Sequence, residues 1–158
     1  MSIELNNELV TQQLAQCIAQ CCPENERFII FLNGELGSGK TTFARFFISA
    51  LGYHGLVKSP SYTLVETYSL LKYRILHLDL YRLQLPSELL EIGLYDEFDE
   101  AAIWLIEWPE RALSFLPAPD LVCTFTLVAS HRQLTLQAQT PSGHKLLAMH
   151  QAFCFFKY

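Results

Sequence analysis

One stretch near the start of the chain limits what this sequence can fold into. Residues 28–33 (FIIFLN) are an apolar run, and residues 34–41 (GELGSGKT) fit the phosphate-binding pattern of glycine, four residues and Gly-Lys-Thr. A helical run over residues 43–51 follows and ends at Gly52. Glycines allow a tight turn whose N–H groups point at phosphate oxygens, and the start of the helix adds positive charge. This order predicts a nucleoside triphosphate site, rather than a glycine-rich turn before a core helix.

The residues of this loop have separate expected roles. Lys40 reaches the outer phosphates as a mobile cation, and the Thr41 hydroxyl binds Mg²⁺. The sequence contains no Asn-Lys-x-Asp segment, a motif of GTPases that recognise guanine, so ATP and ADP are favoured over guanine nucleotides. The other loop residues that we expect at the nucleotide are Glu35, Gly37, Ser38, Gly39 and Thr42.

The composition is typical of one globular domain. The chain has 158 residues, of which 51% are hydrophobic, so it can bury its own core and we expect a single domain over residues 1–158. No apolar run reaches the roughly 18 residues of a membrane span, and residues 1–6 lack a secretory pattern, which favours a cytoplasmic protein without membrane contact.

The net charge of −5 argues against strong direct binding to nucleic acid, though not against a protein partner that handles it. The five cysteines lack the spacing of a disulfide framework or zinc ribbon, and we expect small buried side chains.

The rest of the chain alternates between helical and strand patterns. Thr11 is the expected N-cap of the first helix, and the last stretch fits either helix or coil. The pattern predicts an α/β fold, a P-loop NTPase-like domain whose mixed central sheet is flanked by helices and carries antiparallel hairpins. The expected elements are an edge strand at 3–5, a helix at 11–21, hairpins of 64–70 with 73–80 and of 121–128 with 133–139, a buried strand at 102–106, short helices at 86–92 and 109–113, and the final segment at 144–158.

Two acidic residues stand where buried strands end. Asp79 closes one apolar strand and Glu107 closes another, and the carboxyl ends of parallel strands meet at one edge of a sheet. Phosphoryl transfer uses such carboxylates to hold Mg²⁺. Asp79 is therefore a candidate metal ligand, or else an ordinary aspartate at a strand end. Glu107 could hold Mg²⁺, orient the attacking water, or pair with Arg111 four positions later. Together with Lys40 these are the candidate catalytic residues.

Further residues have weaker signals. The hydroxyls of Ser59, Ser61 and Thr63 could sense the γ-phosphate as a switch loop does, or could belong to a solvated turn. Trp108 follows Glu107 and lies either beside the nucleotide or in the core.

Three more side chains complete the set of candidates. Thr11, and Arg132 at the tip of the second hairpin, are candidates for contact with the base, although an exposed arginine in a turn is usually solvated. His77 lies on an apolar strand and is expected to be a core residue rather than a ligand.

Four segments together make the sequence similar to a known family. Residues 34–42 (GELGSGKTT), 59–64 (SPSYTL), 77–82 (HLDLYR) and 106–111 (IEWPER) closely resemble the bacterial TsaE (YjeE) family in order and spacing, over essentially the whole chain. The resemblance implies an ATPase required for threonylcarbamoyladenosine (t6A) modification of tRNA beside the anticodon. It also implies that the protein works with the TsaD–TsaB pair, which transfers the threonylcarbamoyl group, and that ATP hydrolysis resets that complex.

The resemblance also implies roles for single residues. One departure is Ser61, where the family usually has threonine, so the hydroxyl is kept and the β-branch is lost. The matching positions are Lys40, Thr41 and Thr42 for phosphates and Mg²⁺, Asp79 and Glu107 for the acidic residues, and Trp108 for the tryptophan near the nucleotide.

Three kinds of protein fit these observations. The first is a slow ATPase regulated by its partners, with little turnover alone because only Arg82, Arg111 and Arg132 are available as an arginine finger. The second is a P-loop small-molecule kinase, which the lack of an Arg-rich insertion in the second half disfavours. The third is a nucleotide-binding module that does not hydrolyse, against which the two carboxylates argue.

Overall fold

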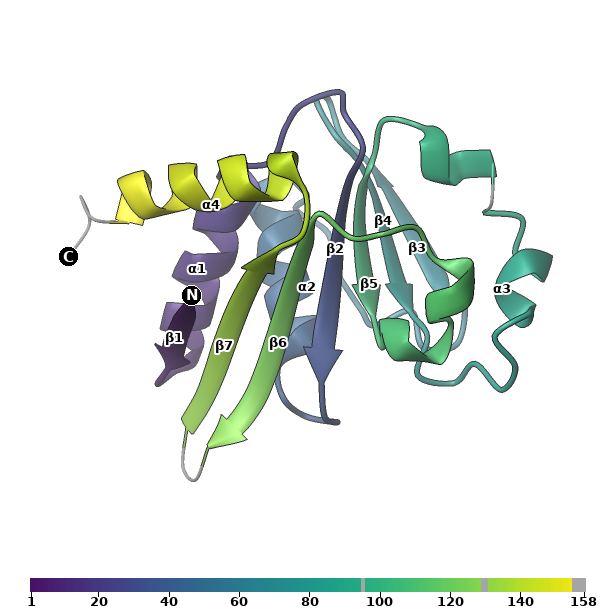
Figure 1. Cartoon of the computed structure of the whole chain (residues 1–158), viewed down its shortest axis with the longest axis horizontal. Coiled ribbons are helices and arrows are strands. Elements are labelled where there is room, and N and C mark those ends of the chain that lie inside the picture. The colour runs from purple at the N-terminus through teal and green to yellow at the C-terminus, as the bar shows by residue number, and fades with distance from the viewer. Residues whose placement is uncertain (95, 129–130, 155–158) are drawn as a thin grey trace.

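A mixed β-sheet forms the centre of the computed structural model, which describes residues 1–94, 96–128 and 131–154 (Figure 1). Among these residues the sheet has seven strands in the order β1-β7-β6-β2-β5-β4-β3. The strands are β1 (Ser2–Leu5), β2 (Phe28–Gly34), β3 (Val65–Ser69), β4 (Arg74–Asp79), β5 (Ile103–Glu107), β6 (Leu121–Val128) and β7 (His131–Ala138). The helices are α1 (Glu8–Gln20), α2 (Lys40–Ala50), α3 (Glu88–Glu91) and α4 (Pro141–Cys154), with short 3₁₀ helices at Asp96–Asp99, Pro109–Arg111 and Leu113–Phe115.

The middle of the sheet is parallel. Strand β5 lies between β2 and β4 and is parallel to both, and β6 is parallel to β2 on its other side. In this register Glu107 stands opposite Leu32 on one side and opposite Asp79 on the other. Strand β5 is buried along its whole length, as expected for a central parallel strand made of a continuous apolar run. The end of β2, from which the glycine-rich loop starts, therefore lies at the same edge as both carboxylates.

Both outer parts of the sheet are antiparallel. Strand β3 pairs with β4, β7 pairs with β6, and β1 pairs with β7 at the edge. The two expected hairpins and the expected edge strand are thus confirmed. The α/β fold class with a mixed, helix-flanked sheet is confirmed as well.

Each face of the sheet has its own apolar core. Alternate residues of β2 point to opposite faces, so that Ile30 packs with the helices α1, α2 and α4 while Phe31 packs on the other side. Figure 1 shows α1 and α2 together on one face and α3 beyond the other. Full burial of each large apolar side chain contributes about 1.5–3 kcal/mol. The core on the Phe31 side of the sheet also contains residues of α3 and of the 3₁₀ segments, and the fully buried Trp104.

Several expected details are corrected by the structure. Helix α1 begins at Glu8, and its N-cap is Asn7, whose Oδ1 accepts a hydrogen bond from Val10 N at 3.0 Å. Thr11 as N-cap is therefore wrong, because Thr11 lies one turn inside the helix. Arg132 lies within β7 rather than at a hairpin tip, since that strand begins at His131. Helix α3 is shorter than the expected range 86–92.

The C-terminal segment and three of the described cysteines follow the expectations. The final segment is helical from Pro141 to Cys154, whereas residues 155–158 lie outside the described residues. Cys21, Cys22 and Cys123 are buried, whereas Cys17 is only partly buried. Burial raises the pKa of the Cys22 and Cys123 thiols. In the described part of the chain, no helix is both long enough and apolar enough to span a membrane.

Asp120 joins helix α4 to the parallel core. Its Oδ2 accepts from Ile29 N of β2 at 2.9 Å, and its Oδ1 accepts from the Thr140 hydroxyl just before α4. Gly143 of α4 packs so closely that a Cβ there would lie 2.0 Å from the carbonyl oxygen of Asp120. This contact requires a glycine at position 143.

We expect Gly143→Ala to lower the free energy of unfolding, although alanine is the better helix former by about 1 kcal/mol. Overlap with a backbone oxygen costs about 1–3 kcal/mol or more, which outweighs that gain. Urea unfolding checks the sign, with Ser142→Ala, an exposed neighbour on the same helix, as the control that changes stability by no more than about 0.5 kcal/mol. An alanine at position 143 that stabilises the protein would contradict the close contact.

Candidate functional site

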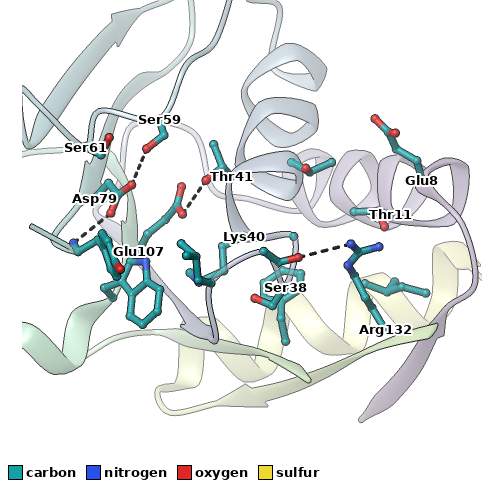
Figure 2. Close-up of a pocket in the computed structure, with 18 of the residues that line it drawn as sticks. Glu8, Thr11, Ser38, Lys40, Thr41, Ser59, Ser61, Asp79, Glu107 and Arg132 are labelled. Atoms are coloured by element: carbon teal, nitrogen blue, oxygen red, sulfur yellow. Dashed lines mark hydrogen bonds between the residues drawn. The ribbon is translucent and has the colours of Figure 1, made fainter. Parts of the chain in front are cut away.

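A cavity of about 450 Å³ opens at the carboxyl edge of the parallel strands (Figure 2). Its wall combines the glycine-rich loop, the ends of β4 and β5, and residues of α1 and β7. Its volume lies within the range of small-molecule and cofactor sites in proteins. The residues predicted from sequence that line it are Thr11, Gly37, Ser38, Gly39, Lys40, Thr41, Thr42, Ser59, Ser61, Asp79, Arg82, Glu107, Trp108 and Arg132.

The loop between β2 and α2 has a backbone that requires glycine. Gly37 and Gly39 have φ angles of 75° and 109°, which side chains disfavour. At Gly34 a Cβ would lie 2.5 Å from the carbonyl oxygen of Phe125. The loop leads directly into α2, so the orphan N–H groups at the helix start face the cavity. Ser38 is fully buried, and its hydroxyl has no hydrogen-bond partner among the described residues. An unpaired polar atom here fits a site built for an anion.

Lys40 lies at the centre of the cavity wall. Its Nζ donates to the carbonyl oxygens of Gly34 at 2.7 Å and Glu35 at 2.9 Å, and it lies 4.0 Å from the centroid of the Trp108 ring. Burial lowers the pKa of the Lys40 ammonium, an effect that the carboxylates of Glu107, Asp79 and Glu110 oppose. The cation is thus removed from water and held by weak neutral acceptors, which a phosphate can replace with stronger contacts.

The two predicted carboxylates are buried and hydrogen-bonded. Glu107 accepts from the Thr41 hydroxyl at 2.8 Å through Oε2, and its Oε1 lies 2.8 Å from His77 Nε2. Asp79 accepts from the Ser59 hydroxyl through Oδ2 and from Tyr81 N at 3.1 Å through Oδ1. The alternative partner of Glu107, Arg111, instead lies 5.8 Å from the centre of the Tyr81 ring.

Trp108 lines the cavity and also packs against the apolar core that contains Trp104. It turns away from the sheet directly after β5 with a φ of 57°, and its ring centre lies 4.9 Å from that of Tyr81. The core tryptophan is Trp104, which is fully buried against Phe98. Trp108 is half-buried, and its ring covers the ammonium of Lys40.

The remaining predicted residues either line the far end of the cavity or are exposed on the surface. Thr11 and Arg132 line the end of the cavity away from Asp79, and Arg132 Nη2 donates to Gly37 O at 3.4 Å (Figure 2). Thr63 is exposed beside Glu66 and is not part of the cavity wall. Glu35 is exposed and contributes its backbone carbonyl to Lys40. For both Thr63 and Glu35, a direct role stays a prediction.

The contact between His77 and Glu107 was not predicted from the sequence. Part of its signal is local, because His77 and Asp79 are two residues apart on one strand and so share a face. The same face carries Ile75, which packs against the helices, whereas Leu76 packs on the other side. The strand register then places His77 opposite Leu105, two residues before Glu107.

A glycine-rich loop joining a buried strand to a helix, with carboxylates at the ends of neighbouring parallel strands, defines the class of P-loop nucleotide-binding proteins. Within this class, a family model described as "Threonylcarbamoyl adenosine biosynthesis protein TsaE" matches residues 5–137. The chain belongs to the TsaE family.

Individual relatives agree with this assignment. The tRNA threonylcarbamoyladenosine biosynthesis protein TsaE of Haemophilus influenzae is 42% identical over 120 residues, which cover 76% of each chain. The protein of the same name from Rickettsia felis is 35% identical over 153 residues, covering 96% of this chain and 88% of the relative. The crystal structure of Bacillus subtilis YdiB has the same fold, with a TM-score of 0.82 and 23% identity over 98% of this chain and 95% of that one.

We expect the fluorescence of Trp108 to change when ADP binds. Lys40 lies against the indole ring, and its movement toward phosphates changes the field at the fluorophore. Trp104→Phe removes the background signal, and the Trp104 indole N–H has no hydrogen-bond partner in the described structure that would be lost. Trp108→Phe is the control, in which the ADP-dependent change should vanish. An unchanged Trp108 signal in a protein that binds ADP by calorimetry would place this residue away from the nucleotide.

Proposed function

We propose that this protein binds ATP with Mg²⁺ in the cavity at the sheet edge and hydrolyses it slowly, as its part in t6A biosynthesis in the cytoplasm. The main support for this proposal is that the glycine-rich loop, Lys40 and two buried carboxylates lie together at the carboxyl edge of the parallel strands. We further propose that residues 1–158 form one domain, since the described strands all pair in a single sheet.

The oxygen atoms around the loop fit Mg²⁺. The Thr41 hydroxyl is bonded to Glu107, and the Ser59 hydroxyl is bonded to Asp79, so hydroxyl and carboxylate oxygens are paired within the site. Protein Mg²⁺ sites commonly use one or two carboxylates and take their other ligands from phosphates and water. Among the described residues, no group of three or more His, Cys, Asp or Glu side chains could hold a metal. We propose Thr41, Asp79 and Glu107 as the metal-binding residues, with the nucleotide completing the site.

The chain's own groups have distinct tasks in this proposal. Loop N–H groups and the Ser38 hydroxyl donate to phosphate oxygens, and Lys40 exchanges its carbonyl partners for the outer phosphates. Mg²⁺, when bound, neutralises negative charge on the phosphates. Glu107 and Asp79 hold the metal or orient water at the reacting end. Thr11 and Arg132, at the opposite end of the cavity, are proposed to contact the base.

The three candidate arginines are each described by a contact within the chain. Arg82 lines the cavity with its guanidinium 3.9 Å from the centre of the exposed Tyr62 ring, and Arg132 donates a hydrogen bond to the loop carbonyl of Gly37. Arg111 is not part of the cavity wall. Since an arginine at the γ-phosphate contributes large rate factors, we expect slow turnover alone and propose that TsaD and TsaB stimulate it.

We expect Lys40→Ala to weaken ATP binding by about 3 kcal/mol, on the order of a hundredfold, because it removes a desolvated cation from the phosphate site. Calorimetric titration with ATP measures this loss. Lys145→Ala, on the exposed side of α4, is the matched control and should bind as the wild type does. Equal ATP affinities for wild type and Lys40→Ala would contradict the phosphate-loop assignment.

The proposed function as a whole is tested by measuring ATP hydrolysis alone and with TsaD and TsaB, while t6A formation on tRNA is followed in parallel. We expect slow hydrolysis alone, faster hydrolysis with the partners, and loss of both hydrolysis and sustained t6A formation in Lys40→Ala. Phosphate transfer to a small acceptor would favour the kinase alternative instead. Nucleotide binding without any hydrolysis in the presence of the partners would reject the ATPase.

A further inference from the structure

A buried histidine lies behind the carboxylate of Glu107. His77 is 0% exposed and Glu107 is 1% exposed, so neither side chain is hydrated at its contact. His77 Nε2 lies 2.8 Å from Glu107 Oε1. The contact joins neighbouring strands, β4 and β5, which the parallel ladder holds in fixed register.

The hydrogen-bond network assigns the hydrogen on this imidazole. Nε2 faces a carboxylate oxygen, which can only accept when the carboxylate is ionised. Nδ1 is buried and has no hydrogen-bond partner in the described structure. A hydrogen on Nδ1 would be an unpaired buried donor, which costs about 1–3 kcal/mol. The favoured arrangement therefore has the hydrogen on Nε2, donated to Glu107 Oε1.

The two carboxylate oxygens of Glu107 have different hydrogen-bond partners. With Oε1 held by His77, Oε2 accepts from the Thr41 hydroxyl at 2.8 Å, at the start of α2. A glutamate side chain has several rotatable bonds, and a single contact would leave the carboxylate free to rotate. Two contacts on opposite oxygens fix its plane. The free lone pairs of Oε2 are thereby kept on the side of the glycine-rich loop.

We infer that His77 is a positioning residue for Glu107, acting through its Nε2–H and without touching the nucleotide. The inference rests on the proposed function, in which Glu107 serves the metal or the attacking water. Partners of this kind orient ligating carboxylates in metal sites, and their loss typically lowers metal affinity or activity 10–100-fold. A core histidine without this role would affect stability alone.

Two substitutions separate the hydrogen bond from the packing. His77→Leu fills much of the space but removes the donor, whereas His77→Gln keeps an N–H group that can reach Oε1. We expect His77→Leu to lower kcat about 10–100-fold and to raise the Mg²⁺ concentration needed for half-maximal activity. The affinity for ATP measured without Mg²⁺ should stay within about twofold, since the loop contacts are unchanged. His77→Gln should recover most of the loss.

A readout independent of turnover is the gain in ADP affinity on adding Mg²⁺, measured by calorimetry. We expect His77→Leu to lose most of this gain and His77→Gln to keep it. Trp104→Phe is the packing control, because Trp104 is fully buried on the opposite face of β5 and does not line the cavity. It should lower stability and leave the Mg²⁺-dependent gain intact.

The outcomes distinguish this inference from the proposed function. If the wild type gains no ADP affinity from Mg²⁺ and hydrolyses no ATP with its partners, the proposed function fails. If the wild type shows both properties and His77→Leu has the same Mg²⁺-dependent gain in ADP affinity, His77 has no positioning role. The same conclusion follows if His77→Leu and His77→Gln lose this gain in ADP affinity equally.

An NMR spectrum of the wild-type protein tests the hydrogen bond even if His77→Leu does not fold. In ¹⁵N-histidine-labelled wild-type protein, we expect a slowly exchanging Nε2–H signal from His77 that shifts in Glu107→Gln. Absence of that signal, or a signal that Glu107→Gln leaves unchanged, would overturn the inference.

Discussion

The site depends on the parallel pairing of β5 between β2 and β4. This pairing brings the end of β2, which starts the glycine-rich loop, to the same edge as Asp79 and Glu107. Side chains alternate between the two faces, so a slip of one residue in either ladder would turn a carboxylate away from the loop. The apolar residues of these strands, buried on both faces, fix the register. The chemistry at the edge is thus a consequence of core packing.

The polar groups at this edge are bonded to one another. Thr41 is bonded to Glu107, Ser59 to Asp79, and Lys40 to carbonyls of its own loop. Such mutual bonding lets charged groups be buried without a ligand, since an unpaired buried charge is far more costly than a paired one. A bound nucleotide and metal would replace these contacts with stronger ones. This is a physical reason why the site can exist both without and with its ligands.

Much of the arrangement could be predicted from sequence because its signals are local. The apolar run, the glycine spacing and the carboxylates at strand ends each lie within one segment, and both hairpins follow from alternation and short turns. The failures have particular causes. Asn7 and Thr11 are both good capping residues, and only the course of the chain into α1 selects Asn7. The bond between His77 and Glu107 joins residues 30 positions apart and depends on strand register, which no local pattern supplies. The TsaE family assignment comes from similarity, whereas the geometry alone indicates a nucleotide site.

We propose that the metal is held jointly by this sheet edge and by the nucleotide. Binding of Mn²⁺, which replaces Mg²⁺ and has an EPR signal, tests it directly in the protein with and without ADP. We expect weak Mn²⁺ binding to the protein alone, tight binding with ADP, and loss of the ADP-dependent gain in Mn²⁺ affinity in Glu107→Gln. Equally tight Mn²⁺ binding without nucleotide, or a gain that Glu107→Gln leaves intact, would contradict it.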